Sequence, residues 1–521
     1  MMDSKISIRE KLDSGTLPLL GKSIIVGLLT GVVATAFRWV IALAESTAFA
    51  VYPFAAANPR WIWAVFAGLI ALGLLICLIV RLAPMSNSSG IPQTKGVVTG
   101  QIDYCWWKVL IAKFCGSSVS TVCGLALGRE GPAIQLGGCV GMGVGKKFAR
   151  SRQEYKVLVA SGAGAGLGTV LGAPLAGVMF AIEDMMHYFS PLILLCTLTS
   201  AVTSQFVAAS VFGLQPIFHF ALSASIPLAS VWVLILLGLV VGLCGVAYTK
   251  ILLVSQQLYK KIPGKPWMRL LLPFLLAGVL GLVLPEVLCG GEYIINTLDV
   301  SMTLRYLLLI LAVKFVFFLI CFDSGAPGGN LFPILVLGSL LGAVFGYFAI
   351  HYMGFAPELF ANFIILAMAG YFAAIARTPI TAIILLMEVT GSFDQLLALA
   401  VVCLIAYAVA DLLKSPPVYD ALLEARVAAE SVNRMDEEQL PDNAQCDMEF
   451  MVQFGSPADG CRLQYLELPA GCRVVSVKRG QNDILPDENI LLRGEDCLQL
   501  LADKKNEADI FKKMSRLTSV N

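Results

Sequence analysis

Two carboxylates occupy places in the sequence where water is scarce. Glu130 stands beside Arg129 in "GREGPAIQLGG", a stretch that otherwise holds glycine, proline and mostly apolar side chains. Asp184 follows Glu183 near the end of the apolar run "APLAGVMFAIEDM". Burial makes a carboxylate costly to keep ionised and favours proton uptake. Reversible proton binding is therefore the chemistry that these side chains can perform.

The composition indicates a membrane protein. Of the 521 residues, 57% are hydrophobic and 14% are charged, and the mean hydropathy is +0.79. These values lie outside the range of soluble globular proteins. Apolar runs at 61–80, 231–248 and 305–321 are long enough to cross a bilayer as helices. We expect an all-α polytopic membrane protein in a lipid bilayer, and the net charge of +1 gives no sign of a nucleic-acid partner.

Basic residues predict the orientation of the chain in the membrane. Residues 1–18 form a charged segment without the apolar core of a cleavable signal peptide. Lys and Arg gather around this segment, at 145–156 and at 258–269, and the positive-inside rule assigns all three places to the cytoplasm. We expect a multi-pass protein of the inner cell membrane with both termini in the cytoplasm.

The chain changes character near residue 425. Residues 19–425 are predicted to form the membrane domain, 426–445 a polar linker, and 446–521 a small α/β cytosolic domain. Its predicted strands are "MEFMVQF", "LQYLELP", "CRVVSVKR" and "ENILLR", and its predicted closing helix is "EADIFKKMSRL".

The cysteines and histidines indicate neither disulfides nor a metal. Ten of the fourteen cysteines lie in apolar segments, and the four in the tail lack metal-ligand spacing: Cys446, Cys461, Cys472 and Cys497. We expect all of them to be reduced packing residues. The three histidines are scattered: His187, His219 and His351. We expect no metal and no cofactor.

The membrane domain contains an internal repeat. Two segments share one spacing of glycine, proline and glycine: Gly128, Pro132, Gly137 and Gly329, Pro333, Gly338. Downstream, "APLAGVMFAIEDM" aligns with "TPITAIILLMEVT". Duplicated membrane halves are typical of transporters, whose substrate sites lie at the repeat interface on broken helices.

The two copies differ at their charged positions. Glu183 aligns with Glu388, whereas Asp184 aligns with Val389. Arg129 and Glu130 align with the uncharged pair at 330–331. We infer that the paired Glu183 and Glu388 are structural. Glu130 and Asp184, each present in one copy only, are the candidate functional carboxylates.

Glycines before a proline predict helices that begin inside the membrane. The free N–H groups and the positive end of such a helix attract an anion, and glycine lets the anion come close. "SSGIP" (88–92) is a third such start, with the Ser89 hydroxyl as a further donor. As a carboxylate, Glu130 can occupy this anion site and swing out on protonation. The alternative is that the glycines only allow tight helix packing.

Two further residues have two interpretations each. Asp184 precedes the polar "HYFSP" and could exchange protons with one aqueous side; alternatively it is a helix-end residue paired with a basic neighbour. Tyr419 in "SPPVYDALL" follows the last span and offers a phenolic donor. On spacing alone, a tyrosine there is more typical of an interfacial anchor.

Four motifs, in order, resemble the CLC family of chloride channels and chloride/proton exchangers. "SSGIP" resembles the GSGIP element, "GREGP" is the family's signature, "GNLFP" resembles GIFAP, and "SPPVYDALL" resembles the segment with the coordinating tyrosine. The resemblance spans about residues 19–425. It implies the CLC fold, with broken helices in two inverted-topology halves, and a homodimer with one pore per subunit.

The resemblance also implies roles for individual residues. Chloride is bound by Ser89, Gly90, Ile91, Asn330, Leu331 and Tyr419. The other positions of the filter motifs are Ser88, Pro92, Gly128, Arg129, Gly131, Pro132, Gly329, Phe332 and Pro333. Glu130 is the external gating glutamate and Asp184 the internal proton site, where exchangers usually have glutamate and channels a residue that cannot carry a proton. The resemblance indicates, from Ser89, that the transported anion is chloride rather than nitrate. The filter motifs indicate that it is not fluoride.

The tail resembles the TrkA-C domain of bacterial potassium-transport regulators. Residues 460–502 contain a leucine-proline step, a strand that ends in basic residues and a "GED" turn before the last strand. The resemblance implies a dimeric ligand-sensing module, with a cyclic dinucleotide as the candidate regulatory ligand. A purely structural role in dimerisation is the alternative.

The leading interpretation is a proton-coupled chloride antiporter in which Glu130 and Asp184 carry protons. A passive voltage- or ligand-gated chloride channel of the same fold is the first alternative. An intramembrane enzyme is not indicated, because the sequence lacks the His-Glu-x-x-His, Gly-x-Ser-Gly and Gly-x-Gly-Asp patterns of such catalysts. A mainly regulatory protein would bind a ligand through its tail without measurable ion flux.

Overall fold

A computed structural model of the chain describes residues 17–213, 218, 226, 230–437, 445–453, 455–479, 482–494, 496–503 and 507–518. The structure divides into two compact units, with the boundary between Leu422 and Leu423. Residues 1–16 of the predicted N-terminal segment lie outside the described residues, as do residues 438–444 of the predicted linker.

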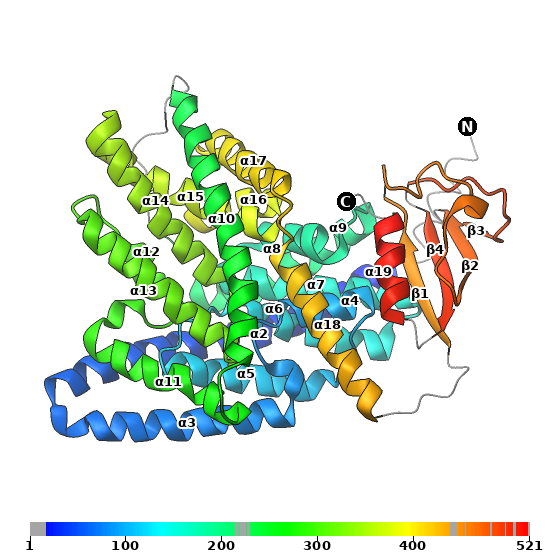
Figure 1. The fold of residues 1–521 in the computed structure, drawn as a ribbon. Coiled ribbons are helices and arrows are strands. Elements are labelled where there is room, and N and C mark those ends of the chain that lie inside the picture. The colour runs from blue at the N-terminus through cyan, green and yellow to red at the C-terminus, as the bar shows by residue number, and fades with distance from the viewer. Residues whose placement is uncertain are drawn as a thin grey trace. The chain divides into compact units, whose positions relative to one another are not determined.

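The first half of the membrane unit is a series of helices of unequal length, coloured blue to cyan in Figure 1. They are α2 (Leu17–Ala57), η2 (Pro59–Trp61), α3 (Ile62–Leu82), η3 (Pro84–Ser86), α4 (Ile91–Thr99), α5 (Trp106–Val122), α6 (Glu130–Phe148), α7 (Arg152–Leu171), α8 (Pro174–Phe180), η4 (Ala181–Met186) and α9 (Pro191–Phe212). The short turns η2 and η3 are 3-10 helices, and η4 is a π-helical turn.

The second half repeats this alternation of long and short helices, coloured green to orange in Figure 1. It consists of α10 (Val231–Lys260), α11 (Pro266–Val283), η6 (Pro285–Val287), α12 (Glu292–Thr297), α13 (Leu304–Asp323), α14 (Leu331–Met353), η7 (Pro357–Leu359), α15 (Phe360–Ala376), α16 (Pro379–Thr390), α17 (Leu396–Leu412) and α18 (Val418–Glu437).

Among the described residues, eight helices are long and apolar enough to cross a bilayer. They include α3, α10 and α13, which confirm the three spans predicted from the apolar runs. Helix α18 continues to Glu437, so the first part of the predicted linker is helical. The cause is composition, because "EARVAAESVNRMDE" is rich in the strong helix formers Ala, Glu, Arg and Met.

The internal repeat is visible in the backbone. Gly90 and Gly291, 201 positions apart, precede α4 and α12 with φ angles of 97° and 103°. Glycine adopts such left-handed angles without the steric cost that a Cβ atom brings. Helix α6 begins at Glu130 and α14 begins at Leu331, again 201 positions apart. The two halves therefore place broken helices at matching points of the chain.

Two buried lysines hold the loops before α4 and α12. Lys113 Nζ donates to the carbonyl oxygens of Ser86, at 3.1 Å, and Ser88. Lys314, its counterpart in the second copy, donates to the carbonyl oxygen of Cys289 at 2.8 Å. A buried ammonium needs such acceptors to offset its loss of hydration. Each lysine thereby fixes the loop that precedes a broken helix.

The aligned glutamates Glu183 and Glu388 form hydrogen bonds that connect the two copies of the repeat. Glu183 accepts hydrogen bonds from the N–H groups of Ile380, at 3.2 Å, and Thr381, at 2.7 Å, at the start of α16. Glu388 accepts one from the N–H of Ala176 at 2.7 Å, at the start of α8. Each glutamate thus caps the helix of the other copy. The prediction that this pair is structural is confirmed.

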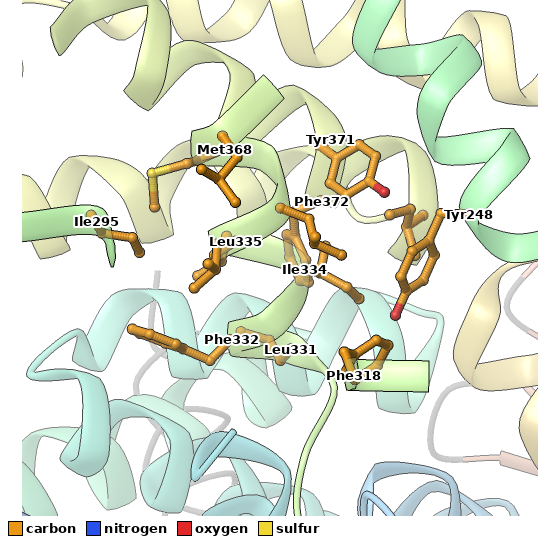
Figure 2. Close-up of a cluster of buried hydrophobic side chains, with 14 of the residues drawn as sticks. Tyr248, Ile295, Phe318, Leu331, Phe332, Ile334, Leu335, Met368, Tyr371 and Phe372 are labelled. Carbon is orange, nitrogen blue, oxygen red and sulfur yellow. The ribbon is translucent and has the colours of Figure 1, made fainter. Parts of the chain in front are cut away.

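The start of α14 is embedded in an aromatic core. Figure 2 shows Phe318 of α13 near Leu331, with Tyr248 of α10 and Tyr371 of α15 farther along the same cluster of buried side chains. The rings of Tyr248 and Phe318 stack with centroids 6.1 Å apart, and Tyr248 meets Tyr371 edge-on at 5.9 Å. These bulky side chains hold the beginning of α14 in place, which keeps the residues just before it in fixed positions.

The second unit contains a four-stranded antiparallel sheet. Its strands are β1 (Gln445–Met451), β2 (Cys472–Arg479), β3 (Asn482–Ile484) and β4 (Cys497–Asp503), in the order β1-β4-β2-β3. Alternate residues of β4, namely Leu498, Leu500 and Ala502, are buried together with Ile510 and Met514 of α19 (Glu507–Thr518). This arrangement confirms the predicted small α/β domain and its closing amphipathic helix.

An ion pair closes the turn before β4. Arg479 at the end of β2 donates to both oxygens of Asp496, at 2.8 and 2.7 Å. The Asp496 carboxylate raises the pKa of the Arg479 guanidinium, because the charged form gains its hydrogen bonds. The basic residue that ends the predicted strand and the aspartate of the "GED" turn thus form one structural element.

Two predicted strands of the second unit are wrong. Residues 463–469 contain the 3-10 turn η8 (Leu463–Tyr465), and 488–493 lie outside the named strands. The two segments do meet: Arg462 and Leu491 form an isolated bridge. The pairing is cut short because η8 turns the chain away, and because Pro469 and Pro486 lack the N–H that a ladder needs. The short strand β3 was not predicted.

Candidate functional site

The three glycine-rich loops of the membrane unit meet at Gly131. A Cβ atom added to Gly131 would lie 2.6 Å from the carbonyl oxygen of Ser89 and 2.9 Å from Cα of Gly329. Gly128 and Gly329 are paired by two backbone hydrogen bonds, of 2.8 and 2.6 Å. Gly328 also donates to the carbonyl oxygen of Ser88 at 3.1 Å. The loops therefore form one backbone framework.

Three helices begin directly after these loops. Helices α4, α6 and α14 start at Ile91, Glu130 and Leu331. Pro92, Pro132 and Pro333 lie within their first turns, where a missing N–H costs nothing. The first N–H groups of a helix have no acceptor four residues earlier, and the helix dipole adds a positive field. Three such ends near one point create a strong preference for an anion.

The side chains at this point are hydrogen-bond donors. Ser89 Oγ donates to Asn330 Oδ1 at 3.1 Å. Asn330 Nδ2 is buried and lacks a hydrogen-bond partner in the structure. The backbone N–H of Gly90, in contrast, donates to Gln93 Oε1 at 3.1 Å. Of the predicted anion ligands, Gly90 is therefore engaged within the protein, while the Asn330 amide has a donor to offer.

Tyr419 is a core residue rather than an interfacial anchor. It is fully buried, its ring meets that of Phe180 edge-on at 6.2 Å, and its Oη has no hydrogen-bond partner in the structure. Tyr419 lies within electrostatic range of both Glu130 and Asp184. A buried phenol without an acceptor is costly. A buried phenol within electrostatic range of both carboxylates fits a ligand that accepts its hydrogen bond.

Glu130 is buried without hydrogen bonds. It is fully inaccessible to solvent, and neither of its carboxylate oxygens has a partner among the described residues. Arg129 Nε lies 3.7 Å away. As the first residue of α6, the carboxylate stands at the positive end of the helix dipole. The side chain is therefore attracted to the anion-binding region without being fastened to it.

Arg129 is shared among several carboxylates. Its Nη2 lies 3.0 Å from Glu292 Oε2, and its Nη1 lies 3.9 Å from Glu45 Oε2. The guanidinium also lies over the ring of Phe332, 5.9 Å from the centroid. Arg129 thus balances charge near Glu130. Glu45 and Glu292 were not predicted, because nothing in their local sequence connects them with the "GREGP" loop.

Asp184 is held by a buried lysine. It lies in the π-helical turn η4, and its Oδ1 is 3.2 Å from Lys95 Nζ, with both side chains 1% exposed. Its Oδ2 is buried and has no hydrogen-bond partner in the structure. Lys95 also lies 2.5 Å from Asp420. Lys95 and Asp420 were not predicted, although Asp420 follows Tyr419 directly in "SPPVYDALL" and Lys95 lies three residues after "SSGIP".

The described residues contain no cluster of His, Cys, Asp and Glu that could hold a metal ion. Among the described residues, these cysteines form no disulfide: Cys77, Cys105, Cys115, Cys123, Cys139, Cys196, Cys244, Cys289, Cys321, Cys403, Cys461, Cys472 and Cys497. The loops around Gly131 thus form a framework of three helix starts, and Glu130 and Asp184 are buried carboxylates of the same unit.

Comparison with known proteins identifies this framework. A family model described as "Voltage gated chloride channel" matches residues 72–411. The "H(+)/Cl(-) exchange transporter ClcA" of Vibrio parahaemolyticus is 33% identical over 454 residues, which cover 84% of this chain and 96% of that protein. The chain belongs to the CLC family. The protein of the same name from Salmonella paratyphi A is 32% identical over 442 residues, covering 83% of this chain and 92% of that protein.

Solved structures of CLC proteins share the fold. A slow cyanobacterial Cl-/H+ antiporter superimposes with a TM-score of 0.73 at 31% identity, covering 79% of this chain and 98% of that one. A CLC-type fluoride/proton antiporter has a TM-score of 0.64 at 22% identity, covering 77% and 96%. The membrane unit thus has the CLC fold with two inverted helical halves. A TrkA-C domain matches residues 447–515.

Proposed function

We propose that this CLC protein exchanges chloride for protons across the membrane. The observation that carries the proposal is the buried amide nitrogen of Asn330, which has no partner among the described residues and lies where the loops before α4, α6 and α14 meet. Donors and helix starts of this kind stabilise an anion. Chloride and protons are the ions named for the relatives that are 31–33% identical. Ser89, Ile91, Asn330, Leu331 and Tyr419 are the proposed chloride ligands.

Glu130 is the proposed gate and outer proton carrier. As a carboxylate it competes with chloride for the helix starts, since both are anions. Protonation removes that attraction and lets the side chain leave. The lack of hydrogen bonds to its carboxylate supports this role, because no fixed bond must break for the side chain to move.

Asp184 is the proposed inner proton site. It is buried, it keeps one oxygen without a partner, and Tyr419 lies within electrostatic range of both Asp184 and Glu130. A buried carboxylate with a free oxygen can accept a proton, and buried ionisable groups in membrane helices commonly belong to proton pathways. Protons would then pass between the two carboxylates on the side of Tyr419.

A passive chloride channel is the second candidate, and the Lys95 contact favours it. An ammonium 3.2 Å from Asp184 stabilises the ionised carboxylate, which opposes proton uptake. If Lys95 keeps Asp184 permanently charged, the residue is structural and only chloride moves. The two candidates therefore differ in whether Asp184 takes up a proton during transport.

Proteoliposomes test the proposal. Vesicles loaded with chloride are placed in lightly buffered medium that is low in chloride, and external pH is recorded as chloride leaves. Exchange predicts that protons enter against their gradient, and that Glu130→Ala abolishes this uptake while chloride still moves. Chloride efflux without proton uptake beyond the leak would show a channel instead.

The remaining proposals concern assembly and regulation. We propose a homodimer in the inner membrane, with one pore per subunit and both termini in the cytoplasm. The TrkA-C domain is proposed to bind a small regulatory ligand, with a cyclic dinucleotide as the candidate. Calorimetric titration of the full-length protein with cyclic dinucleotides tests this, and the absence of binding would leave the domain a structural role in dimerisation.

A further inference from the structure

Lys95 connects two carboxylates that lie far apart in the sequence. Its ammonium is 3.2 Å from Asp184 Oδ1 and 2.5 Å from Asp420 Oδ1. The side chains of Lys95 and Asp184 are each 1% exposed, whereas that of Asp420 is 32% exposed. The three residues come from α4, η4 and the first turn of α18. They form a chain of charges that runs from the interior to solvent.

The charges of this cluster do not balance. With the neighbouring His187 neutral, two carboxylates and one ammonium leave one net negative charge in a largely buried place, where an unbalanced charge is costly. Uptake of one proton makes the cluster neutral. When two carboxylates share one cation, the proton belongs to the group rather than to either residue. Lys95 then pairs with whichever carboxylate remains ionised.

The cluster opens toward one side of the membrane. His187, whose side chain is 42% exposed, has its Nε2 3.8 Å from Asp420 Oδ1. On the same helix as Lys95, the end of α4 approaches the basic segment 145–156: a Cβ atom on Gly100 would lie 2.8 Å from Arg152 Nη2. That basic segment is the one assigned to the cytoplasm. Asp420 and His187 therefore face the proposed cytoplasmic side.

Neighbouring charged groups are engaged elsewhere. Glu183, next to Asp184, accepts hydrogen bonds from the start of α16. Asp103, close to the end of α4, pairs with Lys146 at 3.1 Å. Among the described residues, the ionic partners of Asp420 are Lys95 and His187, and that of Asp184 is Lys95. The cluster is thus defined by these four residues.

We propose that Asp420 is the cytoplasm-facing half of the inner proton site and that Lys95 couples it to Asp184. This inference rests on the proposed chloride/proton exchange. A proton from water first binds Asp420, and Lys95 then neutralises Asp184. Next the O–H bond at Asp420 breaks as an O–H bond forms at Asp184, directly or through a water molecule. Lys95 keeps its three protons throughout and moves to the Asp420 carboxylate.

This arrangement explains how a lysine can neighbour a working proton site. With Asp184 as its only partner, Lys95 would hold that carboxylate ionised. A second carboxylate at 2.5 Å competes for the same ammonium, so protonation of Asp184 leaves no buried cation without a partner. Lys95 is accordingly a positioning residue, and Asp420 and Asp184 are the groups that bind the proton.

The test compares Asp420→Asn with Asp103→Asn in proteoliposomes, with chloride and proton fluxes recorded together. Asp103→Asn makes the same change in a carboxylate that also pairs with a lysine, but whose side chain is 73% exposed. We expect Asp420→Asn to lower the ratio of protons to chloride about tenfold or more, and Asp420→Glu to restore it. Asp103→Asn should leave the ratio unchanged. A purely structural Asp420 would change both fluxes in parallel and keep the ratio.

The outcomes separate the inference from the proposed function. A native protein without chloride-driven proton uptake overturns both. A native protein that couples the two ions, with an unchanged ratio in Asp420→Asn, overturns the role of Asp420 and leaves the exchange function standing. If Asp420→Asn loses chloride flux as well, Asp420→Ser, which keeps a hydroxyl for Lys95, is measured in its place and must show the same fall in ratio.

Discussion

Glu130 and Asp184 are both buried carboxylates of the membrane unit, and the structure holds them in different ways. Glu130 has no hydrogen bond to either oxygen, and its nearest cation, Arg129, lies 3.7 Å away and is shared with Glu292. Asp184 is paired at 3.2 Å with Lys95. One carboxylate has no hydrogen-bond partner among the described residues and lies beside the proposed anion site, whereas the other is paired with a cation.

The difference indicates two kinds of proton site. A loose carboxylate can move, so Glu130 suits a gate whose position changes with protonation. A fastened carboxylate stays in place, and its proton affinity is adjusted by what else the cation contacts. At Asp184 that second contact is Asp420, 2.5 Å from Lys95. Movement of the Glu130 side chain and a change of the carboxylate with which Lys95 pairs can both belong to one proton path.

The largest expected effect is a loss of stability when the cation that pairs with Asp184 is removed. Lys95→Met removes the cation that pairs with both Asp184 and Asp420, and breaking a buried ion pair costs about 3–5 kcal/mol. We expect a clear fall in the melting temperature of the detergent-solubilised protein, partly reversed by adding Asp184→Asn. Lys146→Met, which breaks the exposed pair with Asp103, should cost about 1 kcal/mol or less. Equal losses for the two lysines would contradict the account.

Substitution of Glu130 should change ion transport rather than the stability of the protein. Glu130→Gln keeps the shape of the side chain but cannot carry a proton, so proton uptake should fall about a hundredfold or more. Chloride flux should persist and lose its dependence on pH. Glu358→Gln makes the same change at an exposed glutamate and should behave like the native protein. Sustained proton uptake in Glu130→Gln would remove Glu130 from the proton path.

A third change acts on the framework that both sites share. In Gly131→Ala the new Cβ would lie 2.6 Å from the carbonyl oxygen of Ser89, so the loops must separate. Overpacking of this kind costs about 1–3 kcal/mol, and chloride affinity measured by calorimetry should fall about tenfold. Gly68→Ala provides the control, because no atom lies within 4 Å of its added Cβ. Unchanged chloride affinity in Gly131→Ala would place the anion elsewhere.

The smallest expected effect concerns the sharing of Arg129. Glu292→Gln removes a carboxylate 3.0 Å from the guanidinium, which then interacts more strongly with Glu130. At about 1 kcal/mol for a partly exposed pair, chloride-driven proton uptake should slow several-fold without loss of coupling. The rate of uptake and the proton-to-chloride ratio are measured together. An altered ratio would mean that Glu292 itself belongs to the proton path.

The sequence predicts those parts of the site that depend on local pattern. The starts of α6 and α14 follow from glycine and proline spacing, and the structural role of Glu183 and Glu388 follows from their alignment in the two copies. These features can be predicted from the sequence because both copies of the repeat contain the same pattern of residues. A charged residue that is present in only one copy can then be recognised as a candidate functional residue.

The contacts that tune the carboxylates could not be predicted. Lys95 meets Asp420 only because α4 and α18 pack at the same place, 325 positions apart in the chain. Arg129 likewise reaches Glu292 across 163 positions. Such ion pairs depend on tertiary packing and leave no periodic signal. The prediction of a strand at 463–469 was wrong for a related reason, because the few hydrogen bonds of this segment are formed with residues 488–492 and cannot be predicted from local sequence.

The reversal potential of ion transport tests chloride/proton exchange most directly. Proteoliposomes are given a fixed chloride gradient and several pH gradients, the membrane potential is clamped with potassium and valinomycin, and the potential at which net chloride movement stops is determined. The account predicts that this potential shifts with the pH gradient in the native protein and no longer does so in Glu130→Gln. A native reversal potential that stays at the chloride equilibrium value at every pH gradient would contradict the account and identify a channel.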